Sequence, residues 1–204
     1  MQIDLSVFNP SKRPLIGLDI SSSSVKLLEL VPGEKGKGNF RVERYAVEPL
    51  PRDAVVDGKI VNIEGIADAI GRAWKRMGAT TRYVAMALPA AAVITKKIIL
   101  PANLREQEME IQVESEANQY IPFALEEVNL DFQVLGPAPS SPDEVEVLLA
   151  ASRKEMVEDR VACAEGAGLK PVVMDMETYA AQAAFELIEL QLPEGGRDQT
   201  IALM

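Results

Sequence analysis

The sequence contains no histidine and only one cysteine, Cys163, among its 204 residues. Without histidine the chain cannot build a Ser-His-Asp or Cys-His nucleophile system, a histidine metal site or the commonest general base at neutral pH. One cysteine excludes an internal disulfide framework and fits a reducing compartment. We interpret Cys163 as a small apolar helix residue rather than a reactive thiol. Any catalysis would have to use carboxylates, lysine or a metal ion held by oxygen atoms.

Long apolar runs are also missing. No stretch approaches the roughly 20 uninterrupted apolar residues that a membrane helix requires, and the start Met1-Gln2-Ile3-Asp4 lacks the features of a secretory signal. We therefore expect the chain to stay in the cytoplasm. The net charge of −10, with scattered Lys and Arg residues, argues against a nucleic-acid surface. What the chain does have is 48% apolar residues, enough for one large domain or two small ones with real cores.

The first third of the chain predicts a small sheet and one helix. Residues 1–13 have no sustained period and are interpreted as a flexible arm. Apolar or alternating runs at 15–20, 25–31 and 40–47 predict three strands joined by turns. The helix is predicted from apolar residues spaced by three and four, with Gly78 at its end. These residues, which we assign to core packing, are Ile63, Ile66, Ile70, Trp74 and Met77. A further strand is expected at 83–88.

Residues 89–168 change pattern and predict a separate compact unit. Its expected elements are strand 93–100, helix 104–120, strands 128–135 and 145–152, and helix 153–167. The first of these helices carries a row of glutamates, which we interpret as a solvated face rather than a metal site because one helix side offers no converging ligands. The row comprises Glu106, Glu108, Glu110, Glu114 and Glu116.

From Pro171 the pattern of strand followed by helix, seen in the first third of the chain, returns. Residues 172–176 predict a buried strand, and Glu177 opens a helix with an apolar repeat at Ala180, Ala183, Leu187 and Leu190. A polar connection follows at 191–199, and residues 200–204 have the pattern of a strand that is just beginning.

The segment from Ile16 to Lys26 is the most informative for chemistry. Asp19 sits at the end of a predicted buried strand, directly before a hairpin of four serines. Such a turn can direct backbone N–H groups and hydroxyls at phosphate oxygens, while the carboxylate holds a magnesium ion through water. An ordinary polar hairpin is an equally good interpretation of these residues alone.

Three segments resemble one known family. The run Gly17-Leu18-Asp19-Ile20-Ser21-Ser22-Ser23-Ser24-Val25-Lys26 resembles the first phosphate motif of the actin and FtsA superfamily and is similar to the start of PilM proteins. The segment from Gln119-Tyr120-Ile121-Pro122-Phe123 to Asp131-Phe132 is similar to the PilM segment that leaves the first helix of the inserted subdomain. Met176-Glu177-Thr178-Tyr179-Ala180-Ala181 resembles the superfamily's connecting motif.

The resemblance implies an α/β fold of the actin-like, ribonuclease H-like kind, of which this chain is the N-terminal half. Residues 14–88 plus 169–204 would form subdomain 1A, and residues 89–168 the FtsA-type inserted subdomain 1C. The superfamily's second phosphate motif starts with an aspartate straight after a strand such as 200–203, and the sequence stops there. We therefore expect a truncated form that holds one side of the nucleotide cleft.

The resemblance also implies the ligands. ATP and Mg²⁺ are expected in the full-length parent, with weak or no hydrolysis, whereas this fragment is expected to bind neither tightly and to have no catalytic residue. The nucleotide-binding candidates are Asp19, Ser21, Ser22, Ser23, Ser24, Lys26 and Glu177. Asp19 is the metal candidate, acting on Mg²⁺ through water, and Glu177 would lie near the phosphates.

The partner implied by the resemblance is the cytoplasmic N-terminal peptide of PilN, bound in the groove between 1A and 1C. Other pilus assembly proteins, and self-association through 1C, are further expectations. The protein would be a cytoplasmic scaffold that reaches the inner membrane only through its partners and binds no nucleic acid. Two alternatives stay open: a sugar or acid kinase of the same superfamily, and a component of type II secretion similar to GspL.

Overall fold

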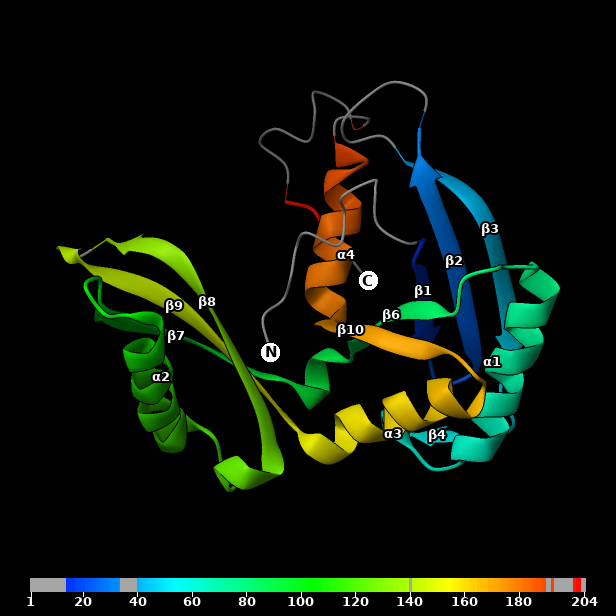
Figure 1. Ribbon diagram of the computed structural model, residues 1–204, viewed down its shortest axis with the longest axis horizontal. Coiled ribbons are helices and arrows are strands. Elements are labelled where there is room, and N and C mark those ends of the chain that lie inside the picture. The colour runs from blue at the N-terminus through cyan, green and yellow to red at the C-terminus, as the bar shows by residue number, and fades with distance from the viewer. Residues whose placement is uncertain (1–13, 34–39, 140, 190–191, 193–199, 203–204) are drawn as a thin grey trace. The chain divides into compact units, whose positions relative to one another are not determined.

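The computed structural model describes residues 14–33, 40–139, 141–189, 192 and 200–202. The predicted arm at 1–13 therefore lies outside the described residues. Two compact units divide the chain: Ala91–Glu158 form the smaller one, and the described residues of 4–90 and 159–204 form the larger one. Figure 1 labels their elements. Each unit has its own sheet and its own core, so each is described by itself.

The larger unit is built on a five-stranded mixed sheet with the order β10-β6-β1-β2-β3. Strand β1 pairs antiparallel with β2, and β2 with β3, whereas β1, β6 and β10 run parallel. The predicted strands are confirmed, because alternate residues of β1 and β2 are buried as a half-covered sheet requires. The strands are β1 (Ile16–Ile20), β2 (Ser24–Pro32), β3 (Phe40–Pro49), β6 (Tyr83–Leu88) and β10 (Lys170–Met176).

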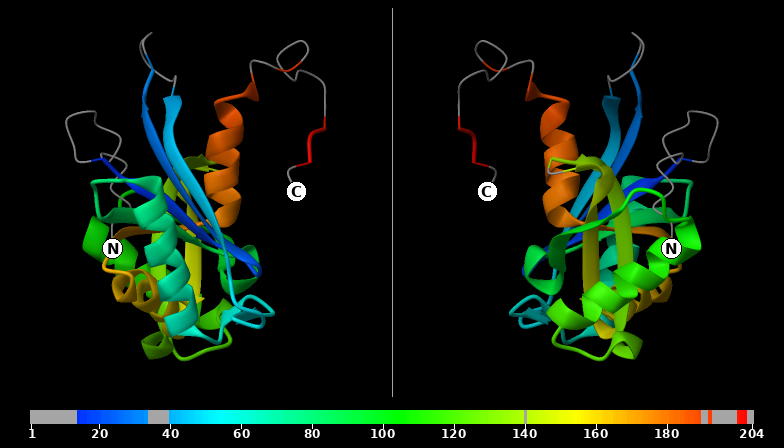
Figure 2. Two further views of the ribbon diagram at one scale, coloured as in Figure 1. Left: turned by 90° about the vertical axis from the view of Figure 1, so that its right-hand side faces the viewer. Right: turned by 90° about the vertical axis from the view of Figure 1, so that its left-hand side faces the viewer.

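Helix α1 (Ile63–Met77) lies against β2 and β3 (Figure 2). The side chain of Asn62 caps its first turn by accepting a hydrogen bond from Gly65 N at 2.8 Å, and Gly78 ends it as predicted. Ile66 and Ile70 are fully buried in the core that the helix shares with β1, β2 and β6. The predicted apolar stripe is therefore the packed face, with Ile63 at its exposed margin.

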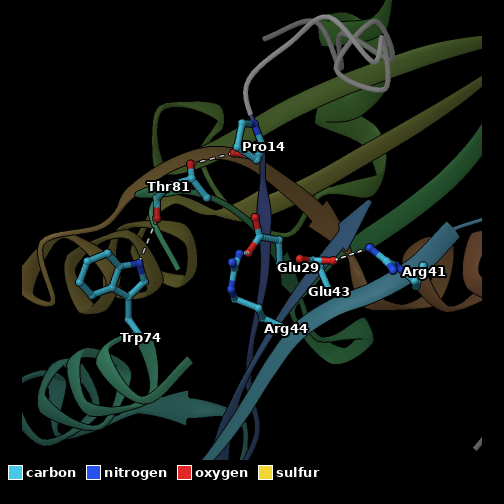
Figure 3. A network of polar contacts seen from close by, with 7 residues as sticks. All are labelled: Pro14, Glu29, Arg41, Glu43, Arg44, Trp74 and Thr81. Atoms are coloured by element: carbon cyan, nitrogen blue, oxygen red, sulfur yellow. Dashed lines mark hydrogen bonds and ion pairs between the residues drawn. The ribbon is translucent and has the colours of Figure 1, made fainter. Parts of the chain in front are cut away.

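Trp74 packs against the core from one side and makes a polar contact on the other (Figure 3). Its indole Nε1 donates to the carbonyl of Thr81 at 2.9 Å, and the Thr81 hydroxyl donates to the carbonyl of Pro14 at 2.7 Å. The same view shows Arg44 donating to the buried carboxylate of Glu29 at 2.9 Å, across β2 and β3. These contacts give polar partners to groups that the sheet and helix would otherwise bury without compensation.

A short hairpin that was not predicted joins β3 to α1. It consists of β4 (Val55–Val56) and β5 (Lys59–Ile60), which pair antiparallel around Asp57 and Gly58. Both turn residues have positive φ angles, 49° and 76°. An Asp-Gly pair in this conformation is the usual choice for a two-residue hairpin turn, so the sequence did contain the signal.

The smaller unit is a three-stranded antiparallel sheet, order β7-β9-β8, with α2 packed on one face. Its core includes Val113 and Ala117 from the helix and Val147 and Leu149 from the middle strand. Tyr120, the last residue of α2, is 43% exposed. The elements are β7 (Ile94–Pro101), α2 (Glu106–Tyr120), the short helix η3 (Leu125–Glu127), β8 (Val128–Ala138) and β9 (Ser141–Arg153), with the short helix η2 (Ala90–Ala92) before them.

Helix α3 (Lys154–Gly166) crosses the boundary between the two units. The sequence pattern placed the boundary after residue 168, but the structure places it between Glu158 and Asp159. The reason is packing, since Cys163 and Ala164 are fully buried in the core of the larger unit. A Cβ added to Gly166 would lie 3.0 Å from that of Ala67, so α3 approaches α1 closely.

Helix α4 (Glu177–Glu186) follows β10 and stands beyond its end (Figures 1 and 2). Its predicted apolar repeat is not buried, because Ala180, Ala183 and the capping residue Leu187 are all exposed. Leu190 lies outside the described residues. The strand predicted at 200–204 is absent from the described residues 200–202, and the two that follow are not described.

Candidate functional site

The candidate site lies at the carboxyl-terminal edge of the parallel strands β1, β6 and β10. Gly17, Ala85 and Val173 share one row across these strands. Two residues further along each strand, side chains point to the same face, which puts Asp19 and Asp175 on that face on either side of Ala87. Glu177 follows directly where β10 ends and α4 begins. The fold thus brings Asp19 and Glu177 to one edge, although 157 positions separate them in the sequence.

Asp19 and Lys26 form an ion pair on this face. Asp19 in β1 is the register partner of Lys26 in β2, and Lys26 Nζ lies 2.6 Å from Asp19 Oδ2. Both side chains remain about half exposed, at 46% and 49%. The predicted metal candidate is therefore neutralised by a neighbouring cation, with which an incoming metal ion must compete.

The serine turn is closed by its own hydrogen bonds. The backbone N and the hydroxyl of Ser21 both donate to the carbonyl of Ser24, at 3.0 and 2.9 Å. The hydroxyl oxygens of Ser21 and Ser24 lie 3.3 Å apart. Leu50 N donates to the carbonyl of Ser23 at 2.8 Å and ties the turn to the end of β3. Ser21 and Ser24 therefore hold the turn together, whereas the exposed Ser22 and Ser23 are the better placed of the four to meet a ligand.

Glu177 is the first residue of α4, where backbone N–H groups and the helix dipole favour negative charge. Desolvation nevertheless raises the pKa of its carboxyl group, and the charge of Asp19 raises it further. Arg160 and Lys26 act in the opposite direction. The charge of Asp19 acts on Glu177 because the strand register brings both residues to the same edge of the sheet.

Mg²⁺ bound to phosphate fits this set of groups. Carboxylate oxygens are the ligands that Mg²⁺ prefers, and the ion normally keeps several waters while substrate phosphates complete its coordination. Within the described residues, His, Cys, Asp and Glu side chains do not converge in groups of three or more that could hold a metal ion. Asp19 would accordingly bind Mg²⁺ through water, and Glu177 could orient such a water molecule.

Two residues at this edge were not among the sequence candidates. Asp175 is partly buried on β10, and its Oδ1 accepts a hydrogen bond from Met176 N at 2.7 Å. Arg160 is 3% exposed on α3; burial lowers the pKa of its guanidinium, and the charges of Glu177 and Asp19 act in the opposite direction. Asp175 could have been found from the sequence, since it is an acidic residue near the end of the predicted strand 172–176 and precedes Glu177 by two residues. Arg160 could not, because arginine on a helix is usually a surface residue.

Comparison with known proteins identifies a family. The family model described as type IV pilus assembly protein PilM matches residues 17–204. The structure described as the PilM-PilN type IV pilus biogenesis complex matches with 32% sequence identity and a TM-score of 0.74, over 88% of this chain and 52% of that chain. The present chain thus spans about half the length of the chain it matches.

A more distant similarity concerns the fold alone. The cytoplasmic domain of EpsL, an inner-membrane component of the type II secretion system of Vibrio cholerae, matches with a TM-score of 0.50 and 13% identity, over 80% of this chain and 57% of that chain. Among the described helices, none combines the length and apolar character of a membrane span. Since the family model covers residues 17–204 and the identity to the PilM-PilN structure exceeds 30%, the chain belongs to the PilM family of type IV pilus assembly proteins.

Proposed function

We propose that this chain is part of a cytoplasmic, ATP-binding scaffold of type IV pilus assembly. The observation that carries the proposal is the position of Asp19 and Glu177 at one edge of a mixed sheet, in a member of the PilM family. Paired carboxylates beside a tight serine turn and a helix amino terminus suit a magnesium-bound polyphosphate. A scaffold is favoured over a kinase because the chain belongs to the PilM family of type IV pilus assembly proteins.

In this proposal the larger unit is subdomain 1A of an actin-like fold, and the smaller unit is the inserted subdomain 1C. The mixed five-stranded sheet and the separate three-stranded sheet support this assignment. Because the chain spans 52% of the matched structure, we propose that it holds only one side of the nucleotide cleft. Alone it should bind ATP weakly or not at all.

Calorimetry with Mg-ATP tests the nucleotide part of the proposal. The 204-residue chain and a chain extended to the length of the matched structure are titrated side by side. We expect binding only in the extended chain, and a loss of affinity of at least tenfold in its Asp19→Asn variant. Tight binding to the 204-residue chain, or full affinity after Asp19→Asn, would overturn the proposal. Lys97→Met, which removes a cation from the smaller unit, is the matched control and should leave the affinity unchanged.

The proposed partner is the cytoplasmic amino-terminal peptide of PilN, through which the protein would reach the inner membrane. Support comes from the matched structure, which is described as a complex of PilM with PilN. An extended peptide can bind a sheet edge through backbone hydrogen bonds, with alternate side chains giving specificity. Fluorescence anisotropy with a labelled PilN peptide and a scrambled peptide of equal charge tests the interaction. Equal affinity for both peptides would argue against specific recognition.

A further inference from the structure

The inference concerns the outward face of strands β2 and β3 in the larger unit. Residues that pair across these strands point to the same side of the sheet, and neighbouring pairs carry exposed apolar side chains there. Tyr45 is 71% and Val42 is 53% exposed, and the others are exposed as well. We call this set the apolar face. It comprises Leu28 and its partner Tyr45, Leu30 and its partner Val42, and Val47, the partner of Lys26.

Charged side chains of β3 lie on the opposite face, which α1 covers. Glu48 forms ion pairs with Arg72 and Arg76 of α1, both at 2.9 Å, and Arg44 pairs with the buried Glu29 at 2.9 Å. A sheet with one solvated face normally directs apolar residues inward and polar residues outward. Strand β3 departs from this pattern, so its outward face has the composition of a covered surface.

The apolar face continues across the neighbouring strands over small residues. Gly17 of β1 is the register partner of Leu28, and Ala85 of β6 is that of Gly17. A Cβ added to Gly17 would meet the carbonyl of Leu28 at 3.8 Å, which is an ordinary contact distance. Helix α4 stands on the side of the sheet opposite α1 (Figure 2), and its Ala180 and Ala183 are exposed too. The larger unit therefore leaves apolar side chains uncovered on two of its elements.

The charges next to the apolar face favour an apolar occupant. Lys26 and Val47 share a row with Asp19, and the ion pair of Lys26 with Asp19 at 2.6 Å compensates both charges. Contiguous exposed apolar side chains usually mark an interaction site. The match to the PilM-PilN structure covers 88% of this chain but 52% of the matched chain. The longer protein proposed above thus has a large part that is available to cover this face.

We infer that the apolar face of β2 and β3 is the surface on which the remainder of the longer chain packs, through an apolar segment that the 204-residue chain does not contain. Packing there removes Tyr45 and its neighbours from water, which is the driving force for such a contact. The segment also lies beside Asp19 and Lys26, because these residues share the face. The inference rests on the proposed function in one respect, that the chain is part of a longer protein, and it does not require ATP to bind.

An added thiol tests the inference without nucleotide. The native Cys163 is fully buried, so a disulfide reagent reports on a thiol placed at the surface. In the 204-residue chain the thiol of Tyr45→Cys should react rapidly. In a chain extended to the length of the matched structure it should react at least about tenfold more slowly, because a covered thiol is reached only through local opening. Equal rates in the two chains would overturn the inference.

The matched control is Ile111→Cys, at an exposed residue of α2 in the smaller unit, which should react rapidly in both chains. If light scattering finds that the 204-residue chain is a dimer in which the thiol of Tyr45→Cys is already protected, a second copy covers the face and the inference is wrong. Because nucleotide is absent, these results do not depend on whether the extended chain binds ATP.

Leu28→Asp gives a second readout. It should lower the urea midpoint of the extended chain clearly more than that of the 204-residue chain, because the carboxylate is buried in the first and stays in water in the second. Ile111→Asp is the control and should shift both midpoints equally little. Equal shifts of the two chains by Leu28→Asp would contradict packing on this face.

Discussion

Lys26 Nζ lies 2.6 Å from Asp19 Oδ2, on neighbouring strands of the larger sheet and at the edge where the parallel strands end. Both side chains are about half exposed, so ions from solution can compete for either of them. The effect of this ion pair on metal binding by Asp19 can therefore be measured separately from its effect on the stability of the fold.

Lys26→Met should change metal access more than stability. Exposed ion pairs contribute about 0–1 kcal/mol, so the free energy of unfolding should fall by less than about 1 kcal/mol in urea titrations. The freed carboxylate of Asp19 should instead bind Mn²⁺ more readily, so that Asp19 signals broaden at lower Mn²⁺ concentration. Lys97→Met, which removes the partner of Glu146 in the smaller unit, is the control. Identical Mn²⁺ responses in Lys26→Met and the parent chain would contradict this role.

Glu177→Gln should make stability less sensitive to acid pH. The folded-state pKa of Glu177 is raised above its ordinary value of 4.5, so the folded protein takes up this proton more readily than the unfolded chain. The protonated Glu177 therefore stabilises the folded protein fully when the pH is below the ordinary pKa of 4.5. This stabilisation is lost as the pH rises through the raised folded-state pKa. Relative to the parent, Glu177→Gln should gain stability between pH 4 and pH 7, measured by urea unfolding. A constant difference across this range would count against the raised pKa.

The thiol of Cys163 should be inert in the folded protein. It is fully buried, and burial raises its pKa to about 11, so little thiolate forms near neutral pH. A disulfide reagent at pH 8 should label it slowly in native buffer and rapidly in urea. Fast labelling without denaturant would mean that α3 does not pack in the core as described.

The two cores should respond separately to cavities. Ile70→Ala in the larger unit and Leu149→Ala in the smaller unit each empty a fully buried site and should cost about 2–5 kcal/mol. Amide hydrogen exchange should increase mainly in the unit that carries the change. The control is Ile111→Ala, which alters a residue that is 65% exposed on α2 and should change stability by less than about 0.5 kcal/mol. Uniform exchange increases in both units would contradict two independent cores.

The sequence predicted most of the fold because its strongest patterns are local. The alternation in β1 and β2 and the spacing of Ile66 and Ile70 in α1 each reflect burial of one face. The boundary within α3 was wrong because Cys163 belongs to a core formed by residues far away in the chain, which periodicity does not reveal.

The site was predicted in part. Asp19 and Glu177 were selected through short motifs, and the parallel register of β1, β6 and β10 brings them to one edge. The burial of Arg160 and its hydrogen bond to the Gly58 carbonyl were not predicted, because neither can be deduced from a helical sequence. Whether the selected residues bind nucleotide stays a prediction.

The electrostatic coupling of Asp19 to Glu177 can be measured by titrating the Glu177 carboxyl carbon by NMR in the parent chain and in Asp19→Asn. Asp19 raises the pKa of Glu177, and Asp19→Asn also releases Lys26, so the variant should show a lower pKa for Glu177. A Glu177 pKa that is the same in both proteins would mean that the two carboxylates do not share a site.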